Sequence, residues 1–174
     1  MILYHGTSDH NARKIEKEGF VPDEKYNWKV KSKEGFVYLS LAYAPFYAMT
    51  AKNRSSNKGA IIGVEVSEEK LYPEDDFVMY QLGLPKYTQK DLDKINLVEI
   101  KLLYKESLKY MGNACAKPKD IKILGVRFFD TSRLLLVCDP VISPLNYRIM
   151  GEYYRNLTRW IYGGQLIEDF TRFE

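Results

Sequence analysis

Short apolar runs, separated by glycine, proline and polar turns, divide the 174-residue chain into strand and helix segments. The run at 60–66 is mostly apolar and β-branched, which is typical of a strand buried on both faces. A turn at Asp130-Thr131-Ser132 is expected to join the last two strands. Strands are predicted at Ile2 to His5, Phe36 to Ser40, Ala60 to Val66, Ile121 to Phe129 and Leu134 to Cys138.

Helix signals fall between and after these strands. Thr7 or Ser8 can cap a first helix that turns Ala12 inward, and Gly19 is placed to end it in the left-handed conformation. Pro45 suits the first turn of a second helix, and an amphipathic last helix is expected from Pro144. A helical stretch is also predicted to start at Thr88, to offer Leu92, Ile95, Leu102 and Leu103 for burial, and to stop at Gly112.

This order of elements predicts an α+β fold with a mixed or mainly antiparallel sheet and flanking helices. The regular alternation of a doubly wound dinucleotide-binding fold is missing, and so is a Gly-rich phosphate loop. A chain of this length buries one core well, so we expect one domain at 1–142 with a helical tail at 143–174 packed on it.

Composition places the chain among ordinary globular proteins, with 45% hydrophobic and 28% charged residues. The net charge of +3 favours an anionic partner only mildly. No stretch approaches the roughly 20 apolar residues that cross a bilayer, and no signal-peptide pattern is present, so we expect no membrane partner and a cytoplasmic location. Cys115 and Cys138 lack the spacing of a metal site, which favours free thiols and no bound metal.

Three segments in the first third of the chain stand out together. They are Leu3-Tyr4-His5-Gly6-Thr7-Ser8, then Val37-Tyr38-Leu39-Ser40 after a Lys-rich loop, and then a helix with Ala44, Tyr47 and Ala48. In this combination the chain resembles an ADP-ribosyltransferase-like domain. Its layout is similar to the rifamycin ADP-ribosyltransferases, the RNA 2′-phosphotransferases and short phage-encoded relatives. The resemblance implies a split, mainly antiparallel sheet and NAD as co-substrate.

The resemblance also assigns roles to individual residues. By analogy with the family, His5 hydrogen-bonds a ribose hydroxyl, the backbone beside it at Gly6 holds the nicotinamide amide, and Tyr38 stacks on the nicotinamide ring. The missing Cβ of Gly6 suits a close approach of ligand to backbone. Thr7 and Ser40 are weaker candidates that would give hydroxyl donors to the ribose or phosphates. We expect His5 and Tyr38 to face one cleft from neighbouring strands.

The acidic residue that completes such a site is left open by the sequence. A carboxylate is needed because positive charge develops on the ribose as its bond to nicotinamide breaks. Many relatives place a Glu at the start of a late strand, where this chain offers Asp130 instead. The rifamycin type places an Asp elsewhere, and the acidic bend at 71–77 offers Asp75 or Asp76. Asp130 ranks first and Asp75 second.

These assignments predict a mono-ADP-ribosyltransferase that releases nicotinamide from NAD and modifies a protein, nucleic acid or small-molecule acceptor. The tail mixes tyrosine, tryptophan and arginine, which suits either stacking on bases or packing on the sheet. An RNA 2′-phosphotransferase is the first alternative, but it needs clustered arginines and Arg13 is the only one in the first 50 residues. The second alternative is a degenerate domain that binds a nucleotide or partner without chemistry, and the missing late Glu favours it.

Overall fold

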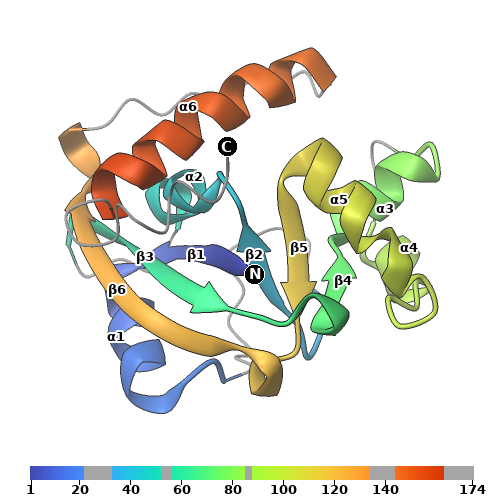
Figure 1. Ribbon diagram of the computed structural model, residues 1–174, viewed down its shortest axis with the longest axis horizontal. Helices are drawn as coiled ribbons and strands as arrows, with labels where there is room; N and C mark the ends of the chain where they lie inside the picture. The colour runs from blue at the N-terminus through green and yellow to red at the C-terminus, as the bar shows by residue number, and fades with distance from the viewer. Residues whose placement is uncertain (22–32, 52–55, 85–87, 134–143, 163–174) are drawn as a thin grey trace.

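The computed structural model describes residues 1–21, 33–51, 56–84, 88–133 and 144–162. Six strands form one sheet in the order β4-β5-β2-β1-β3-β6, and helices flank it (Figure 1). Every pairing between these described strands is antiparallel, which confirms the predicted α+β class. The strands are β1 (Ile2–Ser8), β2 (Val37–Ser40), β3 (Lys58–Glu65), β4 (Leu71–Pro73), β5 (Asn113–Ala116) and β6 (Lys122–Asp130).

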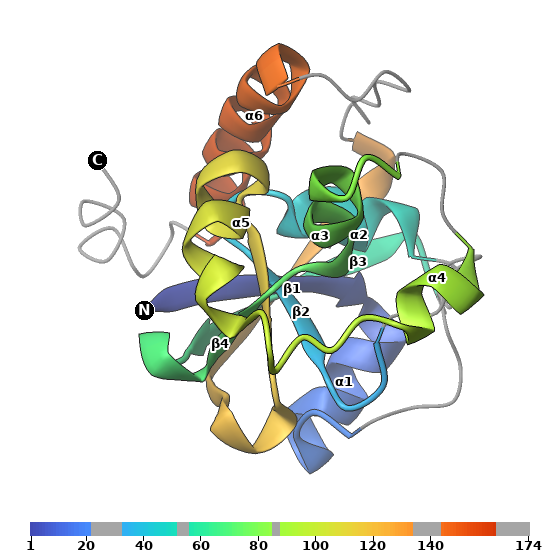
Figure 2. The same cartoon turned by 90° about the vertical axis from the view of Figure 1, so that its right-hand side faces the viewer.

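The sheet is divided into two three-stranded halves. Long ladders join β1, β3 and β6, and shorter ones join β4, β5 and β2. Between the halves, β1 and β2 pair only at Tyr4 and Ser40. We call this junction the seam. Figures 1 and 2 both draw β1 and β2 crossing at a steep angle, so the sheet is split there.

Helices cover both faces of the β1-β3-β6 half. α1 packs on one face, whereas α2 and α6 pack on the other, and α3 to α5 flank the second half (Figure 2). No helix among the described residues is long and apolar enough to span a membrane. The α-helices are α1 (Asp9–Glu18), α2 (Ala44–Thr50), α3 (Asp75–Gln81), α4 (Gln89–Asp93), α5 (Tyr104–Met111) and α6 (Pro144–Tyr162), with short 3₁₀ turns at Glu68–Lys70, Lys101–Leu103, Pro118–Asp120 and Thr131–Arg133.

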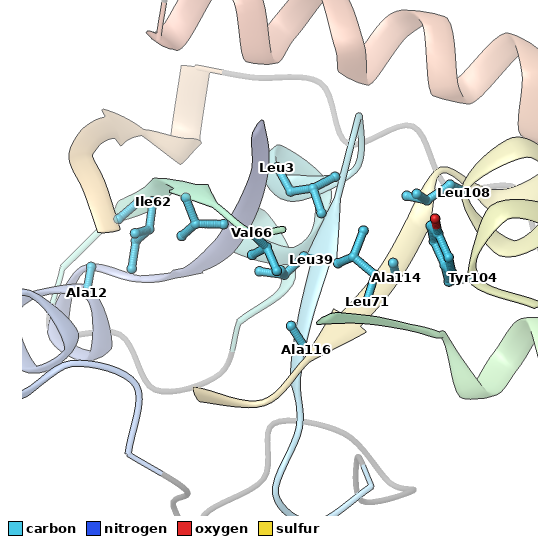
Figure 3. Close-up of a cluster of buried hydrophobic side chains, with 12 residues drawn as sticks. Leu3, Ala12, Leu39, Ile62, Val66, Leu71, Tyr104, Leu108, Ala114 and Ala116 are labelled. Carbon is cyan, nitrogen blue, oxygen red and sulfur yellow. The ribbon is translucent and has the colours of Figure 1, made fainter. Parts of the chain in front are cut away.

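The largest cluster of buried side chains extends across the seam (Figure 3). Leu3 and Ile62 come from one half of the sheet, and Leu39, Leu71 and Ala114 come from the other. β3 is buried from its second to its seventh residue, which confirms the strand predicted to be buried on both faces. Side-chain packing, more than backbone pairing, therefore holds the two halves together.

Local signals read from the sequence set several element ends. Ser8, not Thr7, caps α1, because its hydroxyl accepts the Asn11 N–H at 3.2 Å. Gly19 ends the same helix with φ of 75°. Gly112 ends α5 in the left-handed conformation, with φ of 68° and ψ of 14°. Ser8, Gly19 and Gly112 therefore stand at the predicted helix ends, but Gly19, with ψ of −173°, does not adopt the left-handed helical conformation expected for it.

Other expectations are wrong or fall outside the described residues. The stretch from Thr88 to Gly112 forms two helices, and Leu102 within it is 85% exposed. β4 and β5 were not predicted, because three or four residues carry too little alternation to be recognised. The strand at 134–138, Cys138 and the boundary at 142/143 lie outside the described residues.

The backbone of α2 touches β1 at Gly6. A Cβ there would overlap the carbonyl oxygen of Ala44, which is backbone and has nowhere to move without displacing the helix. We expect Gly6→Ala to lower the free energy of unfolding by about 1–3 kcal/mol or more in a urea titration. Gly151→Ala, whose Cβ would approach the flexible Tyr43 hydroxyl, is the control and should cost less than about 1 kcal/mol. Equal losses in both variants would contradict the proposed close contact.

Candidate active site at the seam

His5 links the two halves of the sheet. Its Nδ1–H donates a hydrogen bond of 2.9 Å to the backbone carbonyl of Tyr38, which fixes the tautomer and leaves Nε2 as an acceptor. Burial lowers the pKa of His5, and the bond to the Tyr38 carbonyl offsets this only in part, so the ring is neutral near pH 7. Phe20 packs edge-on against the ring with centroids 5.2 Å apart. His5 is therefore a held, uncharged imidazole.

The side chains of His5 and Tyr38 lie on opposite faces of the sheet. The Tyr4–Ser40 pair puts those two residues on one face, and Tyr38 alternates onto the same face as Ser40. His5 alternates onto the other face, with Leu3. The expectation that both side chains face one cleft from neighbouring strands is therefore wrong. His5 and Tyr38 are connected by the hydrogen bond from the imidazole to the Tyr38 carbonyl, at the seam where β1 and β2 diverge.

Tyr38 carries its hydroxyl to the start of α3. The phenol oxygen accepts the Lys33 N–H at 2.8 Å and donates to the Asp75 carboxylate. Burial first, and then the negative charge of Asp75, raise the pKa of Tyr38 far above its usual value. Lys33 itself is anchored, since its Nζ donates to the carbonyls of Leu92 and Asp93 at 3.0 and 3.3 Å. The phenol is therefore protonated and fixed in position.

Asp75 is a buried carboxyl group with a strongly perturbed pKa. Burial raises its pKa to about 7, while the hydrogen bond from Tyr38 opposes this rise. The side chain is only 5% exposed, and among the described residues its Oδ1 has no hydrogen-bond partner. A buried polar atom without a partner is rare and costly in folded proteins, and such atoms are concentrated at functional sites. Asp75 is thus the strongest candidate for chemistry in this half of the molecule.

The segment before α3 is tied firmly to the sheet. Glu74 caps α3 by accepting the Phe77 N–H at 3.2 Å, and its own N–H donates to the Ser107 hydroxyl. Burial, with the nearby charges of Asp76 and Asp75, raises the pKa of Glu74 well above normal. Ser107 in turn donates to the backbone carbonyl of Asn113 at 2.7 Å. The acidic bend predicted from the sequence is therefore rigid at the position of Asp75.

Three residues expected to contact a ligand instead have structural contacts. The Ser40 hydroxyl accepts the N–H groups of Ala42 and Tyr43 and donates to the Gly112 carbonyl, so its capacity is used in holding the start of α2. Gly6 lacks a Cβ because the helix passes over it. Thr7 is buried, with 4% of its surface exposed. The contacts of Ser40 and Gly6 explain those residue types without a ligand, and the burial of Thr7 leaves little of it accessible to one.

The structure brings Asp75, and not Asp130, to Tyr38. Asp130 ends β6 at the edge of the sheet, where its carboxylate accepts the N–H and hydroxyl of Ser132 at 3.0 and 2.6 Å. This arrangement is that of a turn former. Asp76, on the first turn of α3, is exposed. The order in which the sequence ranked the acids is therefore reversed by position.

Comparisons with known proteins find no match. This holds for family models, for curated proteins and for solved structures alike. Asn113 was not expected at a site, because an isolated Asn after a helix-ending Gly is typical of a turn. Its buried Oδ1 also has no hydrogen-bond partner among the described residues. Lys25, Lys29 and Lys31 of the basic loop lie outside the described residues.

Proposed function

We propose that this chain is an NAD-dependent mono-ADP-ribosyltransferase whose site lies at the seam, where β1 and β2 diverge. Tyr38 and Asp75 would enter it from one face of the sheet and His5 from the other. The observation that carries the proposal is the buried Asp75 carboxyl, held by Tyr38 and with one oxygen that has no hydrogen-bond partner among the described residues. Such a combination of fixed, neutral and perturbed groups is typical of active sites.

The reaction breaks the bond between the nicotinamide nitrogen and C1′ of the adjoining ribose. The electron pair leaves with nicotinamide, the acceptor forms the new bond to C1′, and the acceptor proton is released to solvent. Positive charge develops on the ribose in the transition state. A preorganised carboxylate stabilises that charge more than it stabilises the neutral ribose of the ground state, and this difference accelerates the step.

Each of the three residues has a distinct part in the proposed site. Asp75 supplies negative charge, and the Tyr38 phenol and the capped start of α3 fix its orientation. His5 offers Nε2 as an acceptor for a ribose hydroxyl, because Nδ1–H is committed to the Tyr38 carbonyl. Tyr38 is half-buried and positions Asp75 through its hydroxyl. The proposal needs no metal ion, since the charge comes from Asp75.

Release of free nicotinamide from NAD is the direct test. We expect purified protein to release it, slowly with water as acceptor and faster once a suitable acceptor is added. We expect His5→Asn to lower the rate by roughly 10²-fold, because the Asn amide keeps a donor near the Nδ1 position but removes the Nε2 acceptor. His10→Asn on the exposed first turn of α1 is the matched control and should leave the rate unchanged.

The same assay separates the alternatives. Nicotinamide release that depends on an RNA bearing an internal 2′-phosphate would support the RNA 2′-phosphotransferase. No release with any acceptor class, together with NAD-dependent thermal stabilisation, would support a binding domain without chemistry. Full activity of His5→Asn would remove His5 from the site.

A further inference from the structure

Asn113 lies on the same face of the sheet as Tyr38. In the β2–β5 ladder Tyr38 pairs with Cys115 and Ser40 pairs with Asn113, so the four side chains share one face. Diagonal neighbours of this kind are roughly 7–8 Å apart, within reach of an aromatic side chain. Asn113 is 7% exposed. It therefore lies in the interior beside the proposed site.

The amide of Asn113 is only partly satisfied. Its Nδ2 donates to the Tyr47 hydroxyl at 3.0 Å, which orients the group, whereas Oδ1 has no hydrogen-bond partner among the described residues. Leaving a buried carbonyl oxygen unpaired is unfavourable, because its hydration is lost and nothing replaces it. The oriented oxygen is therefore a ready acceptor for an N–H or O–H that the protein does not itself supply.

A second unpartnered acceptor lies on this face. Asp75 reaches this face through its hydrogen bond with the Tyr38 phenol, and its buried Oδ1 likewise has no partner in the part of the chain that the structure describes. Two buried acceptors near one tyrosine call for a ligand that brings hydrogen-bond donors. A ligand group rich in negative charge or in acceptors would be repelled by both oxygens.

We propose that Asn113 binds the carboxamide of the nicotinamide group, with Oδ1 accepting a hydrogen bond from one of its N–H groups. This inference rests on the proposed function, because it takes NAD as the substrate. An uncharged carboxamide supplies the missing donors, and the aromatic ring that carries it can pack against an aromatic side chain such as Tyr38. Asn113 is then a specificity residue that selects nicotinamide over ring systems lacking an amide N–H.

The test compares three pyridines that differ only at the substituent. Nicotinamide has the N–H donors, 3-acetylpyridine has a methyl in place of the amide nitrogen, and nicotinic acid has a carboxylate. Titration calorimetry on the full chain should give at least about tenfold tighter binding for nicotinamide than for either analogue. Asn113→Leu, which removes the acceptor at similar volume, should bring nicotinamide and 3-acetylpyridine to equal affinity.

Two further variants keep the proposal falsifiable. Asn113→Asp retains a carbonyl acceptor and should keep a preference for nicotinamide over 3-acetylpyridine. Tyr47→Phe leaves Asn113 in place but removes the hydroxyl that orients its amide, so the preference should fall without disappearing. Thermal unfolding of Asn113→Leu should occur near the wild-type temperature, because removal of the unsatisfied oxygen offsets the loss of the hydrogen bond from Nδ2 to the Tyr47 hydroxyl.

The outcomes for the inference and for the proposed function are separate. An unchanged preference in Asn113→Leu, or a wild type that does not prefer nicotinamide, would overturn the role of Asn113 even if NAD is cleaved. A destabilised Asn113→Leu that keeps its preference would indicate a structural water at Oδ1 instead of a ligand. An Asn113-dependent preference without NAD cleavage would leave the nicotinamide site standing and overturn the transferase.

Discussion

Asp75→Asn is expected to abolish most NAD cleavage and, above neutral pH, to stabilise the protein. The substitution keeps the size of the side chain and an acceptor for the Tyr38 phenol, but removes the charge that the ribose cation needs. Loss of one preorganised electrostatic contact lowers the rate by about 10²- to 10³-fold. Binding of NAD, measured by calorimetry, should be nearly unchanged. The substitution would then lower turnover without lowering the affinity for NAD.

The gain in stability follows from the pKa of Asp75. The folded protein holds this proton up to about pH 7, whereas the ordinary value for the side chain is 3.8. The folded state therefore binds more protons between those values, and the free energy of unfolding falls as the pH rises through that window. At pH 8 the wild type bears the full cost of the buried charge. Asp75→Asn should avoid it and unfold with roughly 2–4 kcal/mol more free energy in urea.

Activity should also depend on the ionisation of Asp75, but it should rise with pH where the free energy of unfolding falls. The charged form of Asp75 is the active one, so kcat/KM of the wild type should rise with pH through about 7 and then level off. Asp130→Asn is the matched control, because it removes a carboxylate that serves an exposed turn, and it should retain the full rate and the same profile. A large loss in Asp130→Asn with none in Asp75→Asn would restore the acid that the sequence ranked first.

The second large effect concerns the last helix. Tyr154 of α6 is fully buried and packs against Tyr43 and Phe46, which lie at the start of α2. Tyr154→Ala should lower the free energy of unfolding by about 3–5 kcal/mol, because truncation of a buried aromatic side chain leaves a large cavity. Tyr154→Phe, which keeps the ring, should lose about 1 kcal/mol. Urea unfolding followed by circular dichroism measures both.

This substitution also tests whether α6 belongs to the cooperative fold. If α6 packs as a dispensable tail, Tyr154→Ala will unfold the helix in a separate early transition and leave the midpoint of the main transition unchanged. A single transition displaced to lower urea would place 144–162 in the same folding unit as the sheet. The contact of Thr158 with the Ala42 carbonyl, at 3.1 Å, favours the single transition.

The parts of the fold that the sequence predicts well are those with long periodic signals. β3 has a mostly apolar run and β6 is long and rich in Ile, Leu, Val and Phe, and Ser8, Gly19 and Gly112 carry their capping roles in their residue types. β4 and β5 are too short to produce a period. They form strands because β5 pairs with β2 and β4 pairs with β5. These pairings depend on the tertiary fold and not on the local sequence.

The candidate site was likewise predictable from local sequence only in part. His5 and Tyr38 were found because they stand in motifs, yet which face of the sheet each side chain occupies depends on a single residue pair that no local pattern encodes. Asp130 was ranked above Asp75 because it stands where many members of the resembled family carry a Glu before a late strand, although in the sequence both are typical turn residues. Only the burial of Asp75 and its hydrogen bond with Tyr38 separate them. Asn113 had no sequence signal at all.

The seam also governs how the molecule can deform. Apolar contact is non-directional, so the two halves of the sheet can slide slightly past each other while the ladders inside each half stay intact. Such a motion would have to break the Tyr4–Ser40 backbone pairing and the hydrogen bond from the His5 imidazole to the Tyr38 carbonyl. Opening at this line should cost less free energy than opening within either half, and amide exchange would register it as a local event. We therefore expect any shear between the halves to pass beside His5 and Tyr38, and such a movement would change the width of the proposed site without unfolding either half.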